Sequence, residues 1–341
     1  MIVPVLIMLV IPGTYPSIKG LTSQMVMRDF VIPLAAGLAI FLFGMQAMRI
    51  GFEQLFLKRV QRVLARLTRT PVSGLLTGLF VTALLQSSSA VMLLVIGLAH
   101  AGLLTFRQTL GIILGTNIGT VLTAELVAIS VTDLGIYLFI GGALLFLTAR
   151  VSIRNIGLAL GGFGLLLVGM EIMQAATVFI QTIAQPLPIQ QWVNHHVLGA
   201  VLVGTLFTAL IQSSTATTVM TMNLVQEGLL TLKGGLGVVL GSNIGTCATA
   251  LLGSLATNET GKQAAIAHLV LNCLGVFLFI PLVPVLQWVV EAMADNALLQ
   301  VAHAQAIFNI LCSLAALPFV SSLEKLVIWI TSRGRTNDGQ A

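Results

Sequence analysis

The sequence predicts an all-α membrane protein built from two inverted repeats, each with a re-entrant helical hairpin and transmembrane helices. Only 8% of its 341 residues are charged and 57% are hydrophobic, whereas soluble domains carry about 25% charged residues. Its apolar runs are near or above the roughly 20 residues that cross a hydrocarbon core. One part of the chain also repeats another. Because lipid satisfies no backbone hydrogen bonds, the spans must be α-helices.

The repeat emerges when the chain is aligned with itself. Gly74–Leu126 aligns without a gap with Ala200–Leu252, at a constant offset of 126 residues. Both copies carry Q-S-S followed by Ser or Thr, and further on both carry G-T-N-I-G-T or G-S-N-I-G-T. A general bias toward Leu does not place Gln, Asn and paired Ser at identical offsets. The pattern therefore indicates an internal duplication.

Each copy begins with a segment of unusual length. The 35 residues between Pro71 and Arg107 include no Lys, Arg, Asp or Glu. As one helix they would be roughly 52 Å long, which is too long for one span and too short for two spans with a turn. A re-entrant hairpin at 72–101 fits this length, with the helix broken at Gln86 to Ser88. The second copy predicts the same hairpin at 197–227.

The connectors before the two hairpins differ in charge. The first, Arg49–Arg69, holds six basic residues, and its apolar residues have helical spacing. We expect an amphipathic helix on the cytoplasmic surface. The second, Gln174–His196, contains no Lys or Arg. By the positive-inside rule it faces the opposite side, so the two repeats are inverted.

The predicted organisation is an N-terminal segment 1–30, repeat 1 at 31–150, repeat 2 at 151–290, a last transmembrane helix at 291–320 and a cytoplasmic tail at 321–341. The length allows about six full spans plus shorter segments. Besides the hairpins, spans are expected at Val31–Met48, Leu110–Val131, Leu134–Ala149, Ile156–Met173, Gly234–Ala256, Ala265–Val289 and Leu298–Val320. For the N-terminal segment, a signal peptide and a start at Met25 or Met27 both stay open.

The helix breaks are the candidate binding site. A break leaves N–H groups unpaired at a helix start, and their partial positive charge suits an anion. Amide and hydroxyl side chains there can hydrogen-bond to its oxygen atoms. The sequence places no Arg or Lys beside them, so a divalent anion would need a co-bound cation. The predicted anion-binding residues are Gln86, Ser87, Ser88, Ser89, Gln212, Ser213, Ser214 and Thr215.

Neutral oxygen atoms for such a cation follow in the N-I-G-T segments. Glycines there could let the helix unwind and expose carbonyls, and oxygen ligands without carboxylates suit Na⁺ better than Ca²⁺ or a transition metal. For Ser and Thr in membrane helices, the competing interpretation is packing or a hydrogen bond to a carbonyl of the same helix. The predicted Na⁺ ligands are Asn117, Thr120, Ser242, Asn243 and Thr246.

Other polar residues also lie in apolar segments. Glu125 and Glu171 are candidates for ion or proton binding. The cysteines form no C-x-x-C pair and are interpreted as small apolar residues. Two polar pairs with i, i+4 spacing favour helix–helix hydrogen bonds over substrate contact. These pairs are His268 with Asn272 and Gln305 with Asn309.

The paired motifs resemble those of the type II sodium-phosphate cotransporters, whose hallmark is a duplicated Q-S-S-S hairpin followed by a G-x-N-I-G-T helix. The likeness covers about Val31 to Val320, with Thr215 in place of the last Ser of the second motif. It implies sodium-coupled symport of inorganic phosphate across the bacterial cytoplasmic (inner) membrane. The hairpins would hold phosphate and the following helices would help to hold sodium. An elevator-like motion of the hairpin core would follow by analogy.

Other functions stay open at this stage. The alternatives are a phosphate exporter, or a transporter of another tetrahedral oxyanion such as arsenate or sulfate. An intramembrane enzyme would need a base beside Ser87 or Ser213, and the sequence places no His or Lys there, so we expect no enzyme. The expected partners are phosphate, Na⁺ and the lipid bilayer. No nucleic acid and no cofactor besides the coupling ion are expected, and a homodimer is left open.

Overall fold

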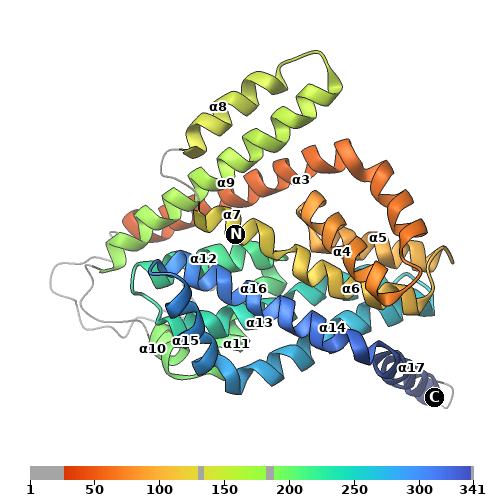
Figure 1. The fold of residues 1–341 in the computed structure, drawn as a ribbon. Coiled ribbons are helices and arrows are strands. Elements are labelled where there is room, and N and C mark those ends of the chain that lie inside the picture. Colours follow the sequence, from red (N-terminus) through yellow and green to blue (C-terminus); the bar gives the residue numbers. More distant parts are fainter. Residues whose placement is uncertain (1–26, 130–133, 182–187, 339–341) are drawn as a thin grey trace.

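The computed structural model describes residues 27–129, 134–181 and 188–338, and these ranges form helices and short connections without a strand (Figure 1). Their secondary structure confirms the prediction of an all-α protein. The elements are η1 (Met27–Val31), α3 (Ile32–Leu67), α4 (Pro71–Leu85), α5 (Ser88–His100), α6 (Phe106–Gly119), α7 (Val121–Ile129), α8 (Leu134–Phe146), α9 (Val151–Gln181), α10 (Pro188–His195), α11 (Val197–Ile211), α12 (Ser214–Gln226), α13 (Leu232–Ser254), α14 (Glu259–Phe279), η2 (Ile280–Leu282), α15 (Val283–Met293), α16 (Ala297–Ala316), η3 (Leu317–Phe319) and α17 (Val320–Asp338).

Within the described ranges, six helical stretches are long and apolar enough to cross a membrane. Shorter apolar helices lie between them, as predicted for a chain with about six full spans plus shorter segments. Nearly all of the predicted N-terminal segment, residues 1–26, lies outside the described residues. The six stretches are Met27–Leu64, Phe106–Ile129, Val151–Thr177, Leu232–Ser254, Glu259–Met293 and Ala297–Ser332.

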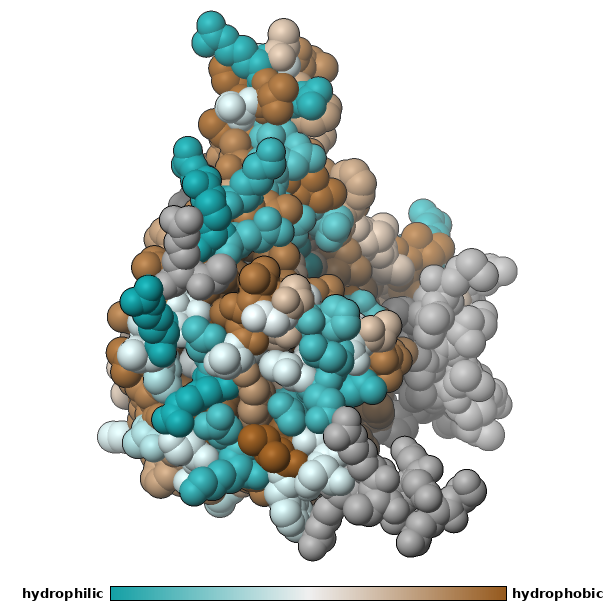
Figure 2. All heavy atoms as spheres, turned by 90° about the vertical axis from the view of Figure 1, so that its right-hand side faces the viewer, coloured by the Kyte–Doolittle hydropathy of each residue, from teal (hydrophilic) through white to brown (hydrophobic). Residues whose placement is uncertain are grey.

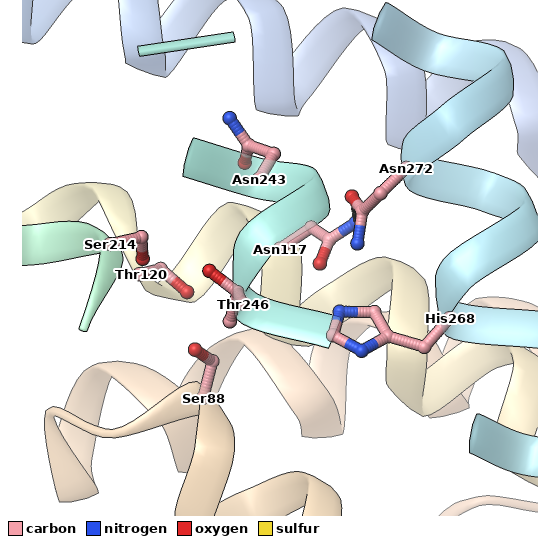
Figure 3. Close-up of a pocket in the computed structure, with 8 residues that line it drawn as sticks. All are labelled: Ser88, Asn117, Thr120, Ser214, Asn243, Thr246, His268 and Asn272. Atoms are coloured by element: carbon pink, nitrogen blue, oxygen red, sulfur yellow. Dashed lines mark hydrogen bonds between the residues drawn. The ribbon is translucent and has the colours of Figure 1, made fainter. Parts of the chain in front are cut away.

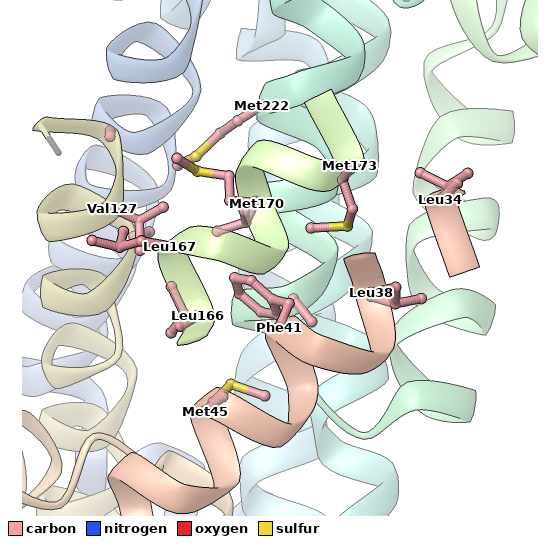
Figure 4. Packing of buried hydrophobic residues seen from close by; sticks show 14 of the residues in the cluster. Leu34, Leu38, Phe41, Met45, Val127, Leu166, Leu167, Met170, Met173 and Met222 are labelled. Carbon is pink, nitrogen blue, oxygen red and sulfur yellow. The ribbon is translucent and has the colours of Figure 1, made fainter. Parts of the chain in front are cut away.

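The two long helices α3 and α9 pack against each other in antiparallel directions. A Cβ atom placed on Gly44 would lie 2.6 Å from the carbonyl oxygen of Gly162, and one on Gly51 would lie 2.7 Å from that of Asn155. From Gly44 to Gly51 the residue number on α3 increases, while the number of the contacted residue on α9 decreases from 162 to 155. Glycine is needed here because the backbones approach too closely for a side chain. Figure 4 shows the apolar contact, to which α3 contributes Leu34, Leu38, Phe41 and Met45 and α9 contributes Leu166, Leu167, Met170 and Met173.

The basic connector of repeat 1 forms the second half of α3. The predicted helix is present, but it continues the preceding span instead of starting anew, since residues 52–70 contain no Gly or Pro to interrupt it. Its buried residues Val60 and Leu64 join an apolar cluster with Leu85 and Val91, which flank the first helix break. The second half of α3 thus packs against the residues on either side of the first helix break.

Each segment predicted as a hairpin contains two short helices separated by two residues. Gln86 and Ser87 separate α4 from α5, and Gln212 and Ser213 separate α11 from α12. These helices have 15 and 13 residues in both copies. At 1.5 Å per residue, a helix of 15 residues covers about 22 Å, less than a bilayer core.

The helix that follows each pair packs closely on the first helix of that pair. A Cβ atom on Gly119 would lie 2.7 Å from the carbonyl oxygen of Leu79 on α4, and one on Gly245 would lie 2.6 Å from the Cβ atom of Thr208 on α11. Glycines at four-residue spacing, Gly111, Gly115 and Gly119 on α6 and Gly237, Gly241 and Gly245 on α13, form a ridge of small residues at these contacts. The ridge brings the N-I-G-T segments close to the helix breaks.

The remaining helices depart in detail from the predicted spans. Figure 1 shows α8 beside α9, away from the main body; α8 has 13 residues, fewer than the predicted span Leu134–Ala149. The predicted span Ala265–Val289 contains a 3₁₀ turn at Ile280–Leu282, where Pro281 cannot continue the α-helical hydrogen bonds. Residues 321–338 of the segment predicted as a tail are helical as part of α17, and residues 339–341 lie outside the described residues.

One end of the molecule carries many of its hydrophilic side chains. Figure 2 views the protein from the side on which α17 lies in Figure 1, and hydrophilic residues gather there among apolar ones. At this end Arg107, at the start of α6, forms a salt bridge of 3.5 Å with Glu324 of α17. The predicted topology assigns both residues to the cytoplasmic side.

Candidate functional site

Both helix breaks have the same backbone conformation. Gln86 (φ 54°) and Gln212 (φ 57°) are the non-glycine residues with positive φ in the described part of the chain. This left-handed conformation costs a non-glycine residue roughly 1–2 kcal/mol. Ser87 and Ser213 follow in extended conformation, and each hydroxyl accepts a hydrogen bond from the backbone N–H three residues later, at 3.1 and 3.2 Å. The first turns of α5 and α12 are therefore built alike.

The two copies meet at a polar cavity (Figure 3). Its lining includes three pairs of residues that are 126 positions apart, one member from each copy. The cavity volume is about 10 Å³, which is room for roughly one water-sized molecule. The pairs are Ser88 with Ser214, Asn117 with Asn243 and Thr120 with Thr246, and α14 adds His268 and Asn272.

The threonines of this cavity use their hydroxyl hydrogens within their own helices. Thr120 donates to the Thr116 carbonyl at 2.8 Å, and Thr246 donates to the Ser242 carbonyl at 2.9 Å. A hydroxyl whose hydrogen is engaged this way presents only lone pairs to other groups. Both hydroxyls can therefore accept from a donor or bind a cation, although the same hydrogen bonds also fit the competing interpretation of simple packing.

The expected unwinding of the N-I-G-T helices is wrong for the second copy. α13 runs without interruption through Asn243 and Thr246, so its carbonyls remain in the helix. In the first copy the helix is interrupted at a single residue, Thr120, between α6 and α7. The glycines here serve close packing against α4 and α11, and a packed helix keeps its backbone hydrogen bonds.

The other predicted site residues lie around the cavity but do not line it. Ser87 and Ser213 cap helices, and Ser213 also lies 3.4 Å from the Met45 sulfur. Ser242 is fully buried and donates to the Val239 carbonyl at 2.7 Å. Ser89 is half-buried and Thr215 is 4% exposed, each one residue beyond the serine that lines the cavity.

The two glutamines differ in their side-chain surroundings. The Nε2 atom of Gln86 donates to the Ala83 carbonyl at 2.5 Å, and its Oε1 atom accepts a hydrogen bond from Thr123. Gln212 is exposed. Both side chains therefore lie outside the cavity lining, and the left-handed backbones of these two residues form the helix breaks beside it.

Arg49 corrects the expectation that no basic residue lies beside the breaks. Its Nε atom donates to the backbone carbonyl of Gln86 at 3.2 Å. A cation at this carbonyl, the end of α4, is also favoured by the helix dipole. One turn earlier on α3, Met45 contacts Ser213 of the other break. One face of α3 therefore contacts both breaks. The sequence did not indicate this contact, because Arg49 and Gln86 are 37 residues apart in the chain.

The polar pair on α14 adds two cavity residues that are not among the predicted anion-binding residues or Na⁺ ligands. Asn272 accepts a hydrogen bond from Asn117 at 3.1 Å and donates to the Cys247 sulfur at 3.2 Å, so the expected helix–helix hydrogen bond is confirmed for this residue. His268 is 2% exposed, and its Nδ1 atom has no hydrogen-bond partner among the described residues. The i, i+4 spacing of His268 and Asn272 was the sequence feature that indicated a shared polar face on this helix.

The acidic candidates lie outside the cavity. Glu125 on α7 is 2.9 Å from the Nδ1 atom of His303 on α16, and both side chains are about one-fifth exposed, at 20% and 23%. Glu171 on α9 is half-buried and does not line the cavity.

The fold and the cavity define a multi-pass helical membrane protein with a polar site between two duplicated motifs. The model of the Na⁺/Pi-cotransporter family matches residues 40–175 and 188–308, which is most of the chain. The chain belongs to this family. Members of the family are transporters rather than enzymes, and the assignment confirms the resemblance seen in the motifs.

Three relatives place the chain more closely. The Bacillus subtilis (strain 168) protein named uncharacterized protein YqeW is 34% identical over 300 residues, covering 87% of this chain and 97% of that protein. The Escherichia coli (strain K12) protein named putative inorganic phosphate export protein YjbB is 27% identical over 300 residues, 86% of this chain and 54% of that protein. The human sodium-dependent phosphate transport protein 2B is 34% identical over 114 residues, 32% of this chain and 16% of that protein.

No solved structure matches the chain. The apolar helices and the bacterial relatives together confirm the expectation of a multi-pass bacterial membrane protein.

Proposed function

We propose that the protein carries inorganic phosphate across the cytoplasmic membrane together with Na⁺ as the coupling ion. The observation that supports this most is the cavity into which both copies place the same three residue types, Ser, Asn and Thr. The family assignment supplies the substrate class, and the sodium-dependent relative supports the coupling ion. No further cofactor is part of the proposal.

In this proposal the helix pairs are re-entrant hairpins in two inverted repeats. Their lengths, too short to cross a bilayer, favour this arrangement. The antiparallel packing of α3 and α9 supports the inversion, because Gly44 and Gly169 belong to the same Gly-Met motif in the two halves. The two breaks then approach the cavity from opposite sides of the membrane.

Phosphate would be held by the helix starts at Ser88 and Ser214. Their backbone N–H groups and hydroxyls are donors, and the helix dipoles add partial positive charge. Na⁺ would be held by the acceptor oxygens of Thr120, Thr246 and the asparagines. Neutralising the anion with a bound cation lowers the cost of removing it from water, which makes co-transport the favoured chemistry.

The cavity volume of about 10 Å³ is too small for a phosphate ion. A space of this size accommodates one water-sized particle, so a tetrahedral oxyanion requires the two helix starts to separate. We assign this structure to a closed form of the transport cycle, and substrate entry to a movement of one helix pair relative to the other.

The proposal is tested by uptake of ³²P-phosphate into proteoliposomes with a Na⁺ gradient, with an equal K⁺ gradient and with no gradient. Symport requires that phosphate enters the vesicles when the Na⁺ gradient points inward. When the Na⁺ gradient is reversed, the direction of phosphate flux should reverse as well. Equal uptake under all three conditions would exclude sodium coupling. Competition by arsenate and sulfate in the same vesicles defines the substrate: arsenate should compete, because its shape and charge match those of phosphate.

Export of phosphate is the second candidate function. Its support is the relative named as an export protein, which matches across 86% of this chain. Vesicles preloaded with ³²P-phosphate separate the two directions. An exporter moves phosphate from the cytoplasmic side to the external side without an inward Na⁺ gradient. A symporter moves phosphate in the direction of the Na⁺ gradient.

A further inference from the structure

A buried histidine of the polar cavity has an unpaired ring nitrogen. His268 on α14 is 2% exposed, and its Nδ1 atom has no hydrogen-bond partner among the described residues. The sequence favoured a helix–helix hydrogen bond for this residue, and the structure gives Nδ1 none. Figure 3 shows the ring pointing from α14 toward the cavity residues of the paired motifs. Buried polar side chains normally have a partner, so the ring calls for a ligand that enters the cavity.

The surroundings of His268 favour a neutral ring. The other described residues that line the cavity are Ser, Thr and Asn, whose side chains carry no charge. Burying an imidazolium ion without a carboxylate partner costs far more than burying the neutral ring. A neutral imidazole has one N–H donor and one acceptor nitrogen. What His268 can offer an anion here is therefore a hydrogen bond rather than a fixed charge.

The unpaired Nδ1 atom indicates which nitrogen of the ring carries the hydrogen. Among buried groups in proteins, unpaired N–H donors are rarer than unpaired acceptors. The hydrogen of His268 is therefore assigned to Nε2, the nitrogen at the far edge of the ring, while Nδ1 keeps its lone pair. An Nε2–H group that faces the cavity is a donor for the oxygen atom of an anion.

The other side chains of the cavity have already used many of their hydrogens. Both threonine hydroxyls donate within their own helices. Asn117 donates to Asn272 at 3.1 Å, and Asn243 donates to the Val239 carbonyl at 3.0 Å. An anion needs hydrogens directed at its oxygen atoms, and the two helix starts supply some of them. A donor on α14 adds one from a helix that belongs to neither helix pair.

We propose that His268 is a phosphate-binding residue, which donates its Nε2 hydrogen to an oxygen of the anion once the two helix starts have separated. The inference rests on the proposed function, because it adds a contact to the same site. The contact exists in one copy only, since 126 residues earlier the chain has Gly142, which packs against Gly161 of α9. His268 thus makes the binding site asymmetric, although the Ser, Asn and Thr pairs are alike in both copies.

The first experiment measures the phosphate dependence of ³²P-phosphate uptake at saturating Na⁺ for wild-type protein and for substitutions of His268. His268→Phe keeps a ring without the hydrogen and should raise the KM for phosphate about tenfold or more, because a hydrogen bond to a charged group is lost. His268→Gln places a neutral amide N–H near the position of Nε2 and should keep a KM close to that of the wild type. His268→Asn has the same amide on a shorter side chain, so its KM should resemble that of the Phe variant.

The same variants separate a substrate contact from a structural role. A substrate contact changes the KM for phosphate, whereas the Na⁺ concentration for half-maximal uptake at saturating phosphate stays unchanged. His303→Gln is the matched control, because His303 also lies in an apolar helix but contacts Glu125 at 2.9 Å and does not line the cavity. It should keep the wild-type KM. A wild-type KM for His268→Phe, or equal KM values for the Gln and Asn variants, would overturn the assignment.

The second experiment detects phosphate binding without transport. A ligand that binds the folded state raises the thermal midpoint of the purified protein. In Na⁺-containing detergent solution, the rise with phosphate should require about tenfold more phosphate for His268→Phe than for the wild type. Sodium chloride at equal ionic strength is the control for a general salt effect. The same phosphate response in both proteins would contradict the contact.

The outcomes separate this inference from the proposed function. Wild-type protein that neither takes up phosphate nor is stabilised by it contradicts phosphate transport itself. Phosphate uptake by the wild type, combined with unaltered phosphate responses in the His268 variants, contradicts only the role of His268.

Discussion

Thr123 donates a hydrogen bond to the side-chain oxygen of Gln86, but the equivalent pair in the other copy, Thr249 and Gln212, is not joined in this way. The Thr249 hydroxyl is buried and has no partner among the described residues, and Gln212 is exposed. The breaks thus share a backbone conformation and differ in how their glutamines are held.

This asymmetry predicts opposite effects of the same substitution on stability. Thr123→Val removes a hydrogen bond and leaves the Gln86 oxygen unpaired, which should cost on the order of 1–3 kcal/mol. Thr249→Val removes an unpaired buried hydroxyl and should be neutral or stabilising. Thermal unfolding of both purified variants in one detergent tests this, and equal destabilisation would show that the two threonines are equivalent.

Both glutamines should be needed for substrate affinity if their amides reach phosphate when the site opens. Gln86→Met and Gln212→Met should each cost on the order of 1.5–3 kcal/mol of binding, about tenfold or more in apparent phosphate affinity. Gly at each position is the control for the left-handed backbone, since it keeps the conformation without the amide. Met variants with wild-type affinity and rate would exclude the side chains from the site.

Arg49 should contribute to the apparent affinity for phosphate through its hydrogen bond to the Gln86 carbonyl. Arg49→Met removes the donor that holds the Gln86 carbonyl, and we expect an increase in the KM for phosphate of about tenfold, from a loss of roughly 1.5 kcal/mol. Arg62→Met is the matched control, because its Nε atom also donates to a carbonyl of α3 at 3.2 Å but on the exposed face. Equal KM values for the two variants would contradict a role at the break.

The asparagines of the paired motifs should act mainly on the coupling ion. Asn117→Ala or Asn243→Ala is expected to weaken Na⁺ activation of uptake more than phosphate recognition, because both line the cavity beside the acceptor threonines. Separate titrations of Na⁺ at saturating phosphate and of phosphate at saturating Na⁺ make the comparison. Unchanged Na⁺ activation in both variants would remove these residues from the cation site.

The proposed inverted topology predicts that Arg59 is cytoplasmic and Gln185 external, because the basic residues lie only in the first of the two connectors. Gln185 lies outside the described residues. Single cysteines introduced at these positions, in a variant without the three native cysteines, should be labelled by an impermeant maleimide from opposite sides of the membrane. Labelling of both from the same side would contradict the inversion.

The sequence by itself was enough to predict the membrane class, the helix breaks and the family. Low charge and long apolar runs exclude water as the main solvent, and the exact offset between Gln86 and Gln212 made the duplication visible. The breaks were predictable because a charge-free segment had a length that fits neither one span nor two. Local geometry of this kind depends on neighbouring residues along the chain.

Only the tertiary structure decided which side chains share the cavity. The motif predicted eight residues at the breaks, yet the cavity takes Ser88 and Ser214 from them and adds His268 and Asn272 from α14. Arg49 reaches Gln86 because α3 passes the break without ending, and α13 stays intact at Asn243 because packing on α11 retains its hydrogen bonds. Spacing along a chain indicates which face of a helix a residue occupies, whereas contacts between helices depend on crossing angles and close backbone approach, which no single segment encodes.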